Sequence, residues 1–458
     1  MRAFVASYSD AALAAKGGDW GIAGVSLRQK NVWQQLHPQD CLYTLAIRDN
    51  DISEYRLIGS IKSIDVAPEN PQHIVDTLAD AAVRIVTATI TEKGYCLDPD
   101  SGDLDRSNPD LAADLQDLSE PRTMLGFLVA GMQRRRAVNS GPLTIVSCDN
   151  LPDNGRRLRN AVLAFADEVD ASLRAWIETH ASFPATMVDR ITPATTPEDI
   201  DDAAASNGVR DAALVKTEPF VQWVIEDNFA ADRPYWEAGG ALLVGDVQPY
   251  ELAKLQLLNG PHSALAYLGY LAGFELISDV MQNPDFAAYA RLLMSHEISP
   301  VTPEPEGMEH GTYIEELIGR FENTSLGHRT WQIAMDGSQK LPQRLLNTIR
   351  SQLQCGGPIA GLSLAVAAWM RYALGRDEVG KEIDVQDPLV EHFNEIAANA
   401  ANDAEAVVMR FLDLQQVFGT DLATDRRFTS TLAAQFRQLV DKGAAGTVRD
   451  FVASSGMQ

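Results

Sequence analysis

Basic side chains are scarce in this chain. Its 458 residues include 38 lysines and arginines against 63 aspartates and glutamates, a formal net charge of −25. Nucleic-acid surfaces neutralise phosphates with clustered Lys and Arg, and the basic run Arg134-Arg135-Arg136 is too short for that. We therefore expect no nucleic-acid partner. Net charge does not exclude a locally cationic pocket for a small anion.

Cysteine is also rare, and zinc-binding spacings are missing. Cys41, Cys96, Cys148 and Cys355 form no Cys-x-x-Cys pair, and the eight histidines form no His-x-x-x-His pair. Structural and catalytic zinc sites usually show such spacings. We expect no metal, and we interpret Cys148 as a buried reduced thiol.

Long apolar runs are absent as well. Residues 1–16 lack the charged and apolar regions of a secretory signal. The most apolar stretches, 264–277 and 358–370, are interrupted by glycine or polar residues and fall short of the roughly 20 residues that span a bilayer. We expect a cytoplasmic protein with no membrane contact.

The first half of the chain alternates short β-rich runs with helical patterns, which is typical of a parallel sheet covered by helices. We predict strands at 20–27, 82–91, 142–147, 185–188 and 212–216, and helices at 4–16, 71–81, 111–134 and 155–180. Residues 41–48 and 54–61 flank the turn-rich Asp49-Asn50-Asp51 and predict a β-hairpin.

Strand signals stop after Asp246, and helical spacing continues to the end of the chain. A chain of this length exceeds the size of a single core. We predict an α/β plus all-α fold: a Rossmann-like, doubly wound dinucleotide-binding domain at 1–245 and a mainly α-helical substrate domain at 246–458. The glycine-rich turn that opens such a nucleotide domain is missing.

The most informative segment runs from Glu251 to His262. On an ideal α-helix, Lys254, Asn259 and His262 fall at about 0°, 140° and 80°, so they share one half of the surface and could bind one small ligand. The alternative is a solvated lysine, a helix stop at Asn259 and a polar histidine without a ligand.

This segment resembles the Lys-x4-Asn-x2-His signature of the polyol-specific long-chain dehydrogenases, the mannitol dehydrogenase and fructuronate reductase family. Four further blocks, in the same order along the chain, are similar to family blocks: 147–151, 187–193, 217–227 and 328–340. Residues 1–4 resemble only the tail of the family's glycine-rich block. Either the true start lies upstream of Met1, or the chain lacks its central strand.

The resemblance implies a metal-independent oxidoreductase in which Lys254 is the general acid/base. A free lysine has a pKa of about 10.4, so the site has to lower it by desolvation or by a nearby positive charge, such as an oxidised nicotinamide. Asn150 and Asn259 would be amide donors to the reacting oxygen, and His262 would bind a substrate hydroxyl.

Two acids are expected to support this chemistry. Glu251 lies one helical turn before Lys254, and because a carboxylate raises a lysine pKa, a proton relay suits it better than activation. Asp189 would orient groups around the site; alternatively, it forms a local ion pair with Arg190.

The resemblance implies substrate contacts in the late block, so Lys340 is a substrate-binding candidate and Arg329 a weaker one. A carboxylate on the substrate would require a cationic partner, which either residue could provide. Gln332 stands where polyol-active members carry arginine, which favours the fructuronate reductase branch. Arg28, Thr91 and Asn150 are expected to border the cofactor. Arg28 by itself favours NADP, whereas the resemblance favours NAD.

We therefore expect a reductase of a small-molecule keto sugar acid, D-fructuronate, to D-mannonate. The alternatives are the D-fructose and D-mannitol pair and, from another class, a truncated non-catalytic relative that acts as a binding module. The sequence is compatible with a monomer or a homodimer.

Overall fold

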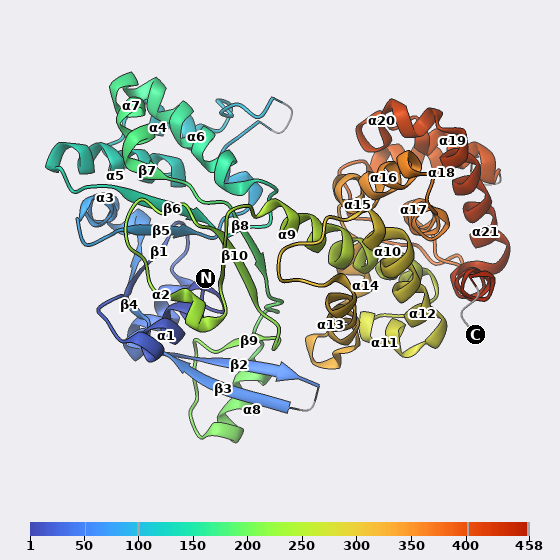
Figure 1. Cartoon of the computed structure of the whole chain (residues 1–458), viewed down its shortest axis with the longest axis horizontal. Helices are drawn as coiled ribbons and strands as arrows, with labels where there is room; N and C mark the ends of the chain where they lie inside the picture. The colour runs from blue at the N-terminus through green and yellow to red at the C-terminus, as the bar shows by residue number, and fades with distance from the viewer. Residues whose placement is uncertain (51, 99–100, 401–402, 456–458) are drawn as a thin grey trace. The chain divides into compact units, whose positions relative to one another are not determined.

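The computed structural model describes residues 1–50, 52–98, 101–400 and 403–455, and the chain divides into two compact units, Met1–Gln248 and Pro249–Gln458. The first unit mixes strands and helices, and the second is helical (Figure 1). The predicted fold class, a Rossmann-type domain followed by a helical domain, is confirmed.

A parallel sheet lies at the centre of one half of the first unit. It consists of β5 (Ile85–Ala88), β6 (Leu143–Ser147) and β7 (Ala181–Ser182), in that order. All five residues of β6 are buried, as expected of a parallel strand that is covered on both faces. Its apolar side chains join one core with those of the helices α5 and α6, which lie beside the sheet in Figure 1.

The helices of this unit are α1 (Val5–Lys16), α2 (Asn31–Leu36), α3 (Pro71–Ala79), α4 (Pro109–Gln116), α5 (Met124–Val138), α6 (Asn154–Val169), α7 (Ala171–His180) and α8 (Pro197–Asn207). Two predicted helices are therefore wrong, because each is broken in two. Asp114 accepts hydrogen bonds from the Arg122 and Thr123 amides and ends α4 in a turn. Asp170 caps α7 through the Ser172 amide, since aspartate competes with the helix for backbone donors.

The predicted hairpin is confirmed as β2 (Tyr43–Asp49) and β3 (Ile52–Ile58), with Asp51 of the predicted turn outside the described residues. β9 (Val215–Thr217) extends it in parallel to β2. The remaining strands of the unit are β1 (Ile22–Ser26) paired with β4 (Ile61–Val66), and β8 (Thr186–Asp189) paired with β10 (Gln222–Glu226) and then β11 (Leu242–Val244). Our strand predictions missed β4, β7, β10 and β11.

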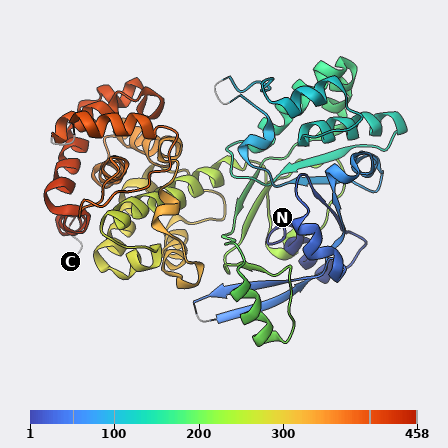
Figure 2. The same cartoon turned by 180° about the vertical axis from the view of Figure 1, so that it is seen from behind.

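The second unit contains only helices and isolated bridges in its described part. Its helices are α9 (Gln248–Ala253), α10 (Gly260–Leu271), α11 (Ile277–Gln282), α12 (Pro284–Leu292), α13 (His310–Glu322), α14 (Thr330–Ala334), α15 (Gly337–Leu341), α16 (Asn347–Cys355), α17 (Ala360–Ala373), α18 (Val390–Ala400), α19 (Ala404–Leu412), α20 (Gln415–Thr424) and α21 (Arg426–Ser454). α10 and α17 are buried on nearly every side and pack against each other, so they form the centre of the unit (Figure 2).

Three segments of this unit are π-helices: η5 (Lys254–Asn259), η6 (Leu293–Ile298) and η9 (Pro342–Leu346). The helical spacing predicted near 249–258 is thus present, but the ideal α-helical angles used for Lys254, Asn259 and His262 do not hold through η5. In η5 the Gly260 amide bonds the Leu255 carbonyl, the i→i+5 closure of a π-turn. Residues five apart then lie about one turn apart, which brings Lys254 and Asn259 nearer to one side than an α-helix would.

No helix in the described ranges is both long enough and apolar enough to cross a membrane.

Candidate active site

Lys254, Asn259 and His262 lie on one continuous helical run. Lys254 opens η5, Asn259 ends it, and His262 is in the first turn of α10. All three side chains are half-buried, as is Glu251 on α9. π-turns occur frequently at functional sites, and this one holds Lys254 and Asn259 directly before the regular helix that carries His262.

The His262 imidazole is enclosed and incompletely bonded. Its ring stacks on Phe321, with centroids 5.1 Å apart, and lies 5.6 Å from the ring of His328. The Nε2 atom is buried and has no hydrogen-bond partner in the part of the chain that the structure describes. Buried polar atoms are rarely left without a partner, so Nε2 is suited to a hydroxyl of a bound ligand.

The side chains that lower the pKa of His262 are all basic. Burial lowers the pKa of His262 well below its usual range, and His328, Arg344, Arg320 and Lys340 lower it further. We call these four residues the basic cluster. His262 is therefore neutral at physiological pH, and the strongly acidic chain holds a cationic site here.

Members of the basic cluster are themselves desolvated. Burial, followed by the charge of Arg344, lowers the pKa of Lys340, whose Nζ donates to the Met335 carbonyl at 2.5 Å. Burial and the charge of Arg320 lower the pKa of His328 to about 4. Of the four residues, only Lys340 was among our site predictions. Arg344, four residues after Lys340, could have been found from that spacing, whereas Arg320 comes from α13.

Arg329 lies apart from this cluster. Its side chain is 65% exposed, and its guanidinium lies 3.8 Å from the Glu275 carboxylate. It is not among the charges that lower the pKa of His262. Its surroundings are those of a solvated surface pair.

In the first unit, Asn150 follows β6 in a loop that is held by its neighbour. The buried Asp149 carboxylate accepts hydrogen bonds from the Leu151 amide at 2.9 Å and from the hydroxyls of Ser147 and Tyr95. Asn150 itself is exposed. This Asx turn fixes the loop at the carboxyl end of the strand, and our site predictions included neither Asp149 nor Tyr95.

Thr91 and Asn150 lie at the same edge of the sheet. β5 and β6 are parallel neighbours with Ala88 opposite Ser147. Thr91 comes three residues after Ala88, and Asn150 comes three residues after Ser147. The carboxyl edge of a parallel sheet is where α/β proteins bind dinucleotides.

Arg28 belongs to the same region. It is exposed directly after β1, and the preceding Leu27 packs into one apolar cluster with Ala88 and Leu151. The carboxyl ends of β1, β5 and β6 thus converge, although β1 is not hydrogen-bonded to the other two.

Asp189 is buried at the end of β8, opposite Gln222 of β10. The Arg190 guanidinium donates hydrogen bonds to the carbonyls of Ala3 and Glu218.

Cys148 is buried, and its burial raises the thiol pKa to about 12. Across the described ranges, no group of three or more His, Cys, Asp or Glu side chains is arranged to hold a metal ion.

Two family models match nearly the whole chain. Residues 1–238 match the mannitol dehydrogenase Rossmann domain, and residues 246–440 match the mannitol dehydrogenase C-terminal domain.

Individual relatives are similar over the same length. D-mannonate oxidoreductase of Escherichia coli is 44% identical, over 97% of this chain and 92% of the relative. Mannitol 2-dehydrogenase of Phaeosphaeria nodorum is 38% identical, over 98% and 79%. The solved structure of Pseudomonas fluorescens mannitol 2-dehydrogenase, a ternary complex with NAD and D-mannitol, superimposes with a TM-score of 0.84 at 37% identity, covering 99% of this chain and 92% of that one.

Proposed function

Because the chain belongs to the mannitol dehydrogenase family, and is thus a dehydrogenase that acts on CH–OH groups, we propose that it interconverts D-fructuronate and D-mannonate. One observation carries this choice: the basic cluster around His262 in a chain of net charge −25. Desolvated cations are stabilised by a bound carboxylate, which a keto sugar acid has and a neutral ketose lacks. The 44% identity to D-mannonate oxidoreductase supports the same choice.

We propose NAD(H) as the cofactor, which suits the Rossmann-type unit. Thr91 and Asn150, at one carboxyl edge, are polar groups that would border it, and Arg28 would contact the ribose or, with NADP, its 2′-phosphate. When bound, the nicotinamide exchanges a hydride with the substrate carbon. The proton has to be handled by the chain itself.

We assign the proton to Lys254, whose ammonium would protonate the alkoxide oxygen during reduction and whose amine would take the hydroxyl proton during oxidation. The Asn259 amide, about one π-turn away, would donate to the same oxygen. His262 Nε2 would bind a neighbouring hydroxyl. Glu251 would relay the proton, and Asn150 and Asp189 keep the donor and supporting roles that the family resemblance implies.

The second candidate pair is D-fructose and D-mannitol. It is favoured by the relatives named mannitol 2-dehydrogenase and by the neighbour solved with D-mannitol. A neutral ketose, however, has no carboxylate to offer the half-buried Arg344 guanidinium near His262.

The test follows the loss of reduced nicotinamide absorbance with D-fructuronate and with D-fructose in parallel, each with NADH and with NADPH. We expect the highest kcat/KM with D-fructuronate and NADH. Faster turnover of D-fructose would favour the second candidate, and no turnover of either ketone would contradict both.

A further inference from the structure

Arg344 is a half-buried cation with few partners. Its Nη1 donates to the Ser263 hydroxyl at 3.0 Å, and it forms no ion pair with any carboxylate within the described ranges. Burying a charge without a counter-charge costs free energy. A ligand anion would remove that cost.

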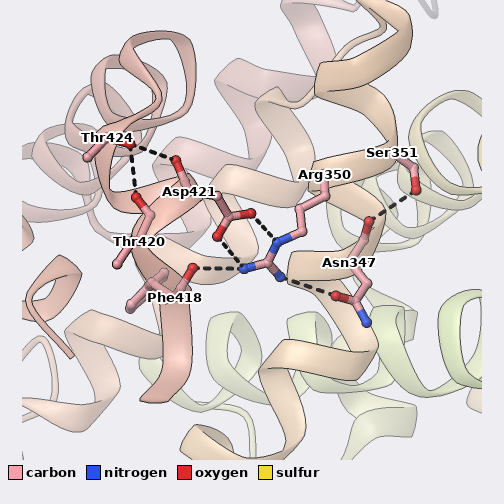
Figure 3. Close-up of polar contacts among 7 residues, drawn as sticks. All are labelled: Asn347, Arg350, Ser351, Phe418, Thr420, Asp421 and Thr424. Carbon is pink, nitrogen blue, oxygen red and sulfur yellow. Dashed lines mark hydrogen bonds and ion pairs between the residues drawn. The ribbon is translucent and has the colours of Figure 1, made fainter. Parts of the chain in front are cut away.

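Other arginines of this chain show what a structural guanidinium looks like here. Figure 3 shows Arg350 of α16: its Nε and Nη2 bond both Asp421 oxygens at 2.6 and 3.0 Å, Nη2 also bonds the Phe418 carbonyl, and Nη1 bonds Asn347. The buried Arg135 donates to six backbone carbonyls. Arg344 has no such set of acceptors.

The backbone holds Arg344 beside His262. Ser263, its hydrogen-bond partner, directly follows His262 on α10. A Cβ atom at Gly260 would lie 2.8 Å from the Arg344 carbonyl oxygen, so η9 packs tightly against the start of α10. Lys340 precedes Arg344 by four residues and also forms no ion pair in the described part of the chain.

We propose that Arg344, with Lys340 beside it, receives the carboxylate of the sugar acid and determines the preference for an acid over a neutral ketose. This inference rests on the proposed function. With Nη1 engaged by Ser263, the Nε and Nη2 edge of the guanidinium is left for a bidentate carboxylate, a geometry that lysine cannot reproduce. Arg344 thus takes the role that sequence resemblance suggested for Arg329.

The experiment compares kcat/KM for D-fructuronate and D-fructose in wild type, Arg344→Met and Arg344→Lys. Loss of one partner of a buried charge pair typically costs two to three powers of ten. We expect Arg344→Met to lower kcat/KM for D-fructuronate about 100-fold, mainly through KM, and to lower the value for D-fructose much less. Arg344→Lys keeps the charge without the fork, so its preference for the acid should fall about tenfold.

Arg350→Met and Arg329→Met are the controls. Both should keep the wild-type ratio of the two substrates, because Arg350 bonds only protein groups and Arg329 is exposed beside Glu275. An equal loss with both substrates in Arg344→Met, or a collapse of the ratio in Arg329→Met, overturns the inference. If Arg344→Met fails to fold, Arg344→Lys decides, and an unchanged ratio there overturns it.

A second readout needs no turnover. D-Mannonate should raise the melting temperature of wild type more than D-mannitol does, and Arg344→Lys should lose most of that difference. If wild type turns over D-fructuronate but the Arg344 variants keep the wild-type ratio of kcat/KM for the two substrates, the role of Arg344 is refuted and the proposed function stands. Wild type that does not turn over D-fructuronate would refute the proposed function and this inference with it.

Discussion

Gly260 and Arg344 lie in backbone contact: a Cβ atom added at Gly260 would stand 2.8 Å from the Arg344 carbonyl oxygen. Such a distance is shorter than real Cβ contacts, and the clash is with backbone, which has little freedom to move. This contact fixes the π-turn η9 against the junction of η5 and α10, where Asn259 and His262 lie.

Gly260→Ala should therefore damage both stability and activity. Overpacking of a tight contact typically costs 1–3 kcal/mol, so we expect the free energy of unfolding in urea to fall by about 2 kcal/mol and kcat/KM to fall with it. Gly319→Ala is the matched control, because Gly319 is in α13 with no atom near the added Cβ. It should stabilise the protein by about 0.5–1 kcal/mol.

Lys254→Ala should abolish turnover of either ketone while NADH still binds. General acid–base groups contribute about 10²- to 10⁴-fold to a rate, and the assignment makes Lys254 the proton carrier. Steady-state kinetics and NADH fluorescence measure the two properties separately. Lys381→Ala, at an exposed position of the same unit, should behave like wild type. Wild-type turnover in Lys254→Ala would contradict the assignment of Lys254 as the proton carrier.

Acid should destabilise the protein through His328 and His262. Burial holds the pKa of His328 at about 4 and that of His262 well below its usual range, while unfolded histidines titrate near 6.5. The unfolded chain therefore binds more protons below about pH 6.5, so the free energy of unfolding falls as the pH falls from 6.5 towards 4.

His328→Gln isolates this contribution. Urea unfolding at pH 7.5 and at pH 4.5 gives the free energy of unfolding at each pH. Its decrease between the two should be about 2 kcal/mol smaller in the variant than in wild type. An identical loss in both proteins would mean that His328 is not held neutral by the fold.

Arg350→Met should weaken the fold without changing substrate preference. The variant loses the bonds from α16 to Asp421 and to the Phe418 carbonyl of α20 (Figure 3). Because Asp421 is largely exposed, we expect a loss of only about 1–2 kcal/mol. The melting temperature measures this loss. Asp421→Asn should lower the melting temperature less than Arg350→Met does, because the hydrogen bond from Arg350 to the Phe418 carbonyl survives. A melting temperature equal to that of wild type in Arg350→Met would contradict this.

Cys355 should be the first thiol to react with a disulfide reagent in the native protein. Cys355 is exposed, whereas Cys148 is buried with a thiol pKa near 12, and only an accessible thiolate attacks. Cys355→Ser should remove the fast phase. A fast phase that survives in this variant would show that a buried thiol is accessible in the native state.

Much of the fold could be predicted because its signals are local. The alternation of apolar residues around Asp49 and Asn50 predicted the hairpin, and the helical spacing after Asp246 predicted the helical unit. The block from Glu251 to His262 carries its residue types at fixed positions, so the family resemblance could be read directly from the sequence.

The errors arose where distant or competing contacts act. Helices at 111–134 and 155–180 are broken by Asp114 and Asp170, whose carboxylates bond backbone amides inside the predicted ranges that a continuous helix would pair with its own carbonyls. The π-turns were not predicted either, and one of them, η9, packs closely against Gly260 through the Arg344 carbonyl. The spacing of apolar residues along the chain predicts neither the helix breaks nor the π-turns.

The sequence by itself therefore determined the class of element in each segment and the chemical groups available for catalysis. The tertiary structure decided which charges meet. Arg320 from α13, His328 from the following loop and Arg344 from η9 converge on His262 only after the helices pack, and burial then determines which of these groups are charged, because desolvation depends on every neighbour in space and not on position along the chain.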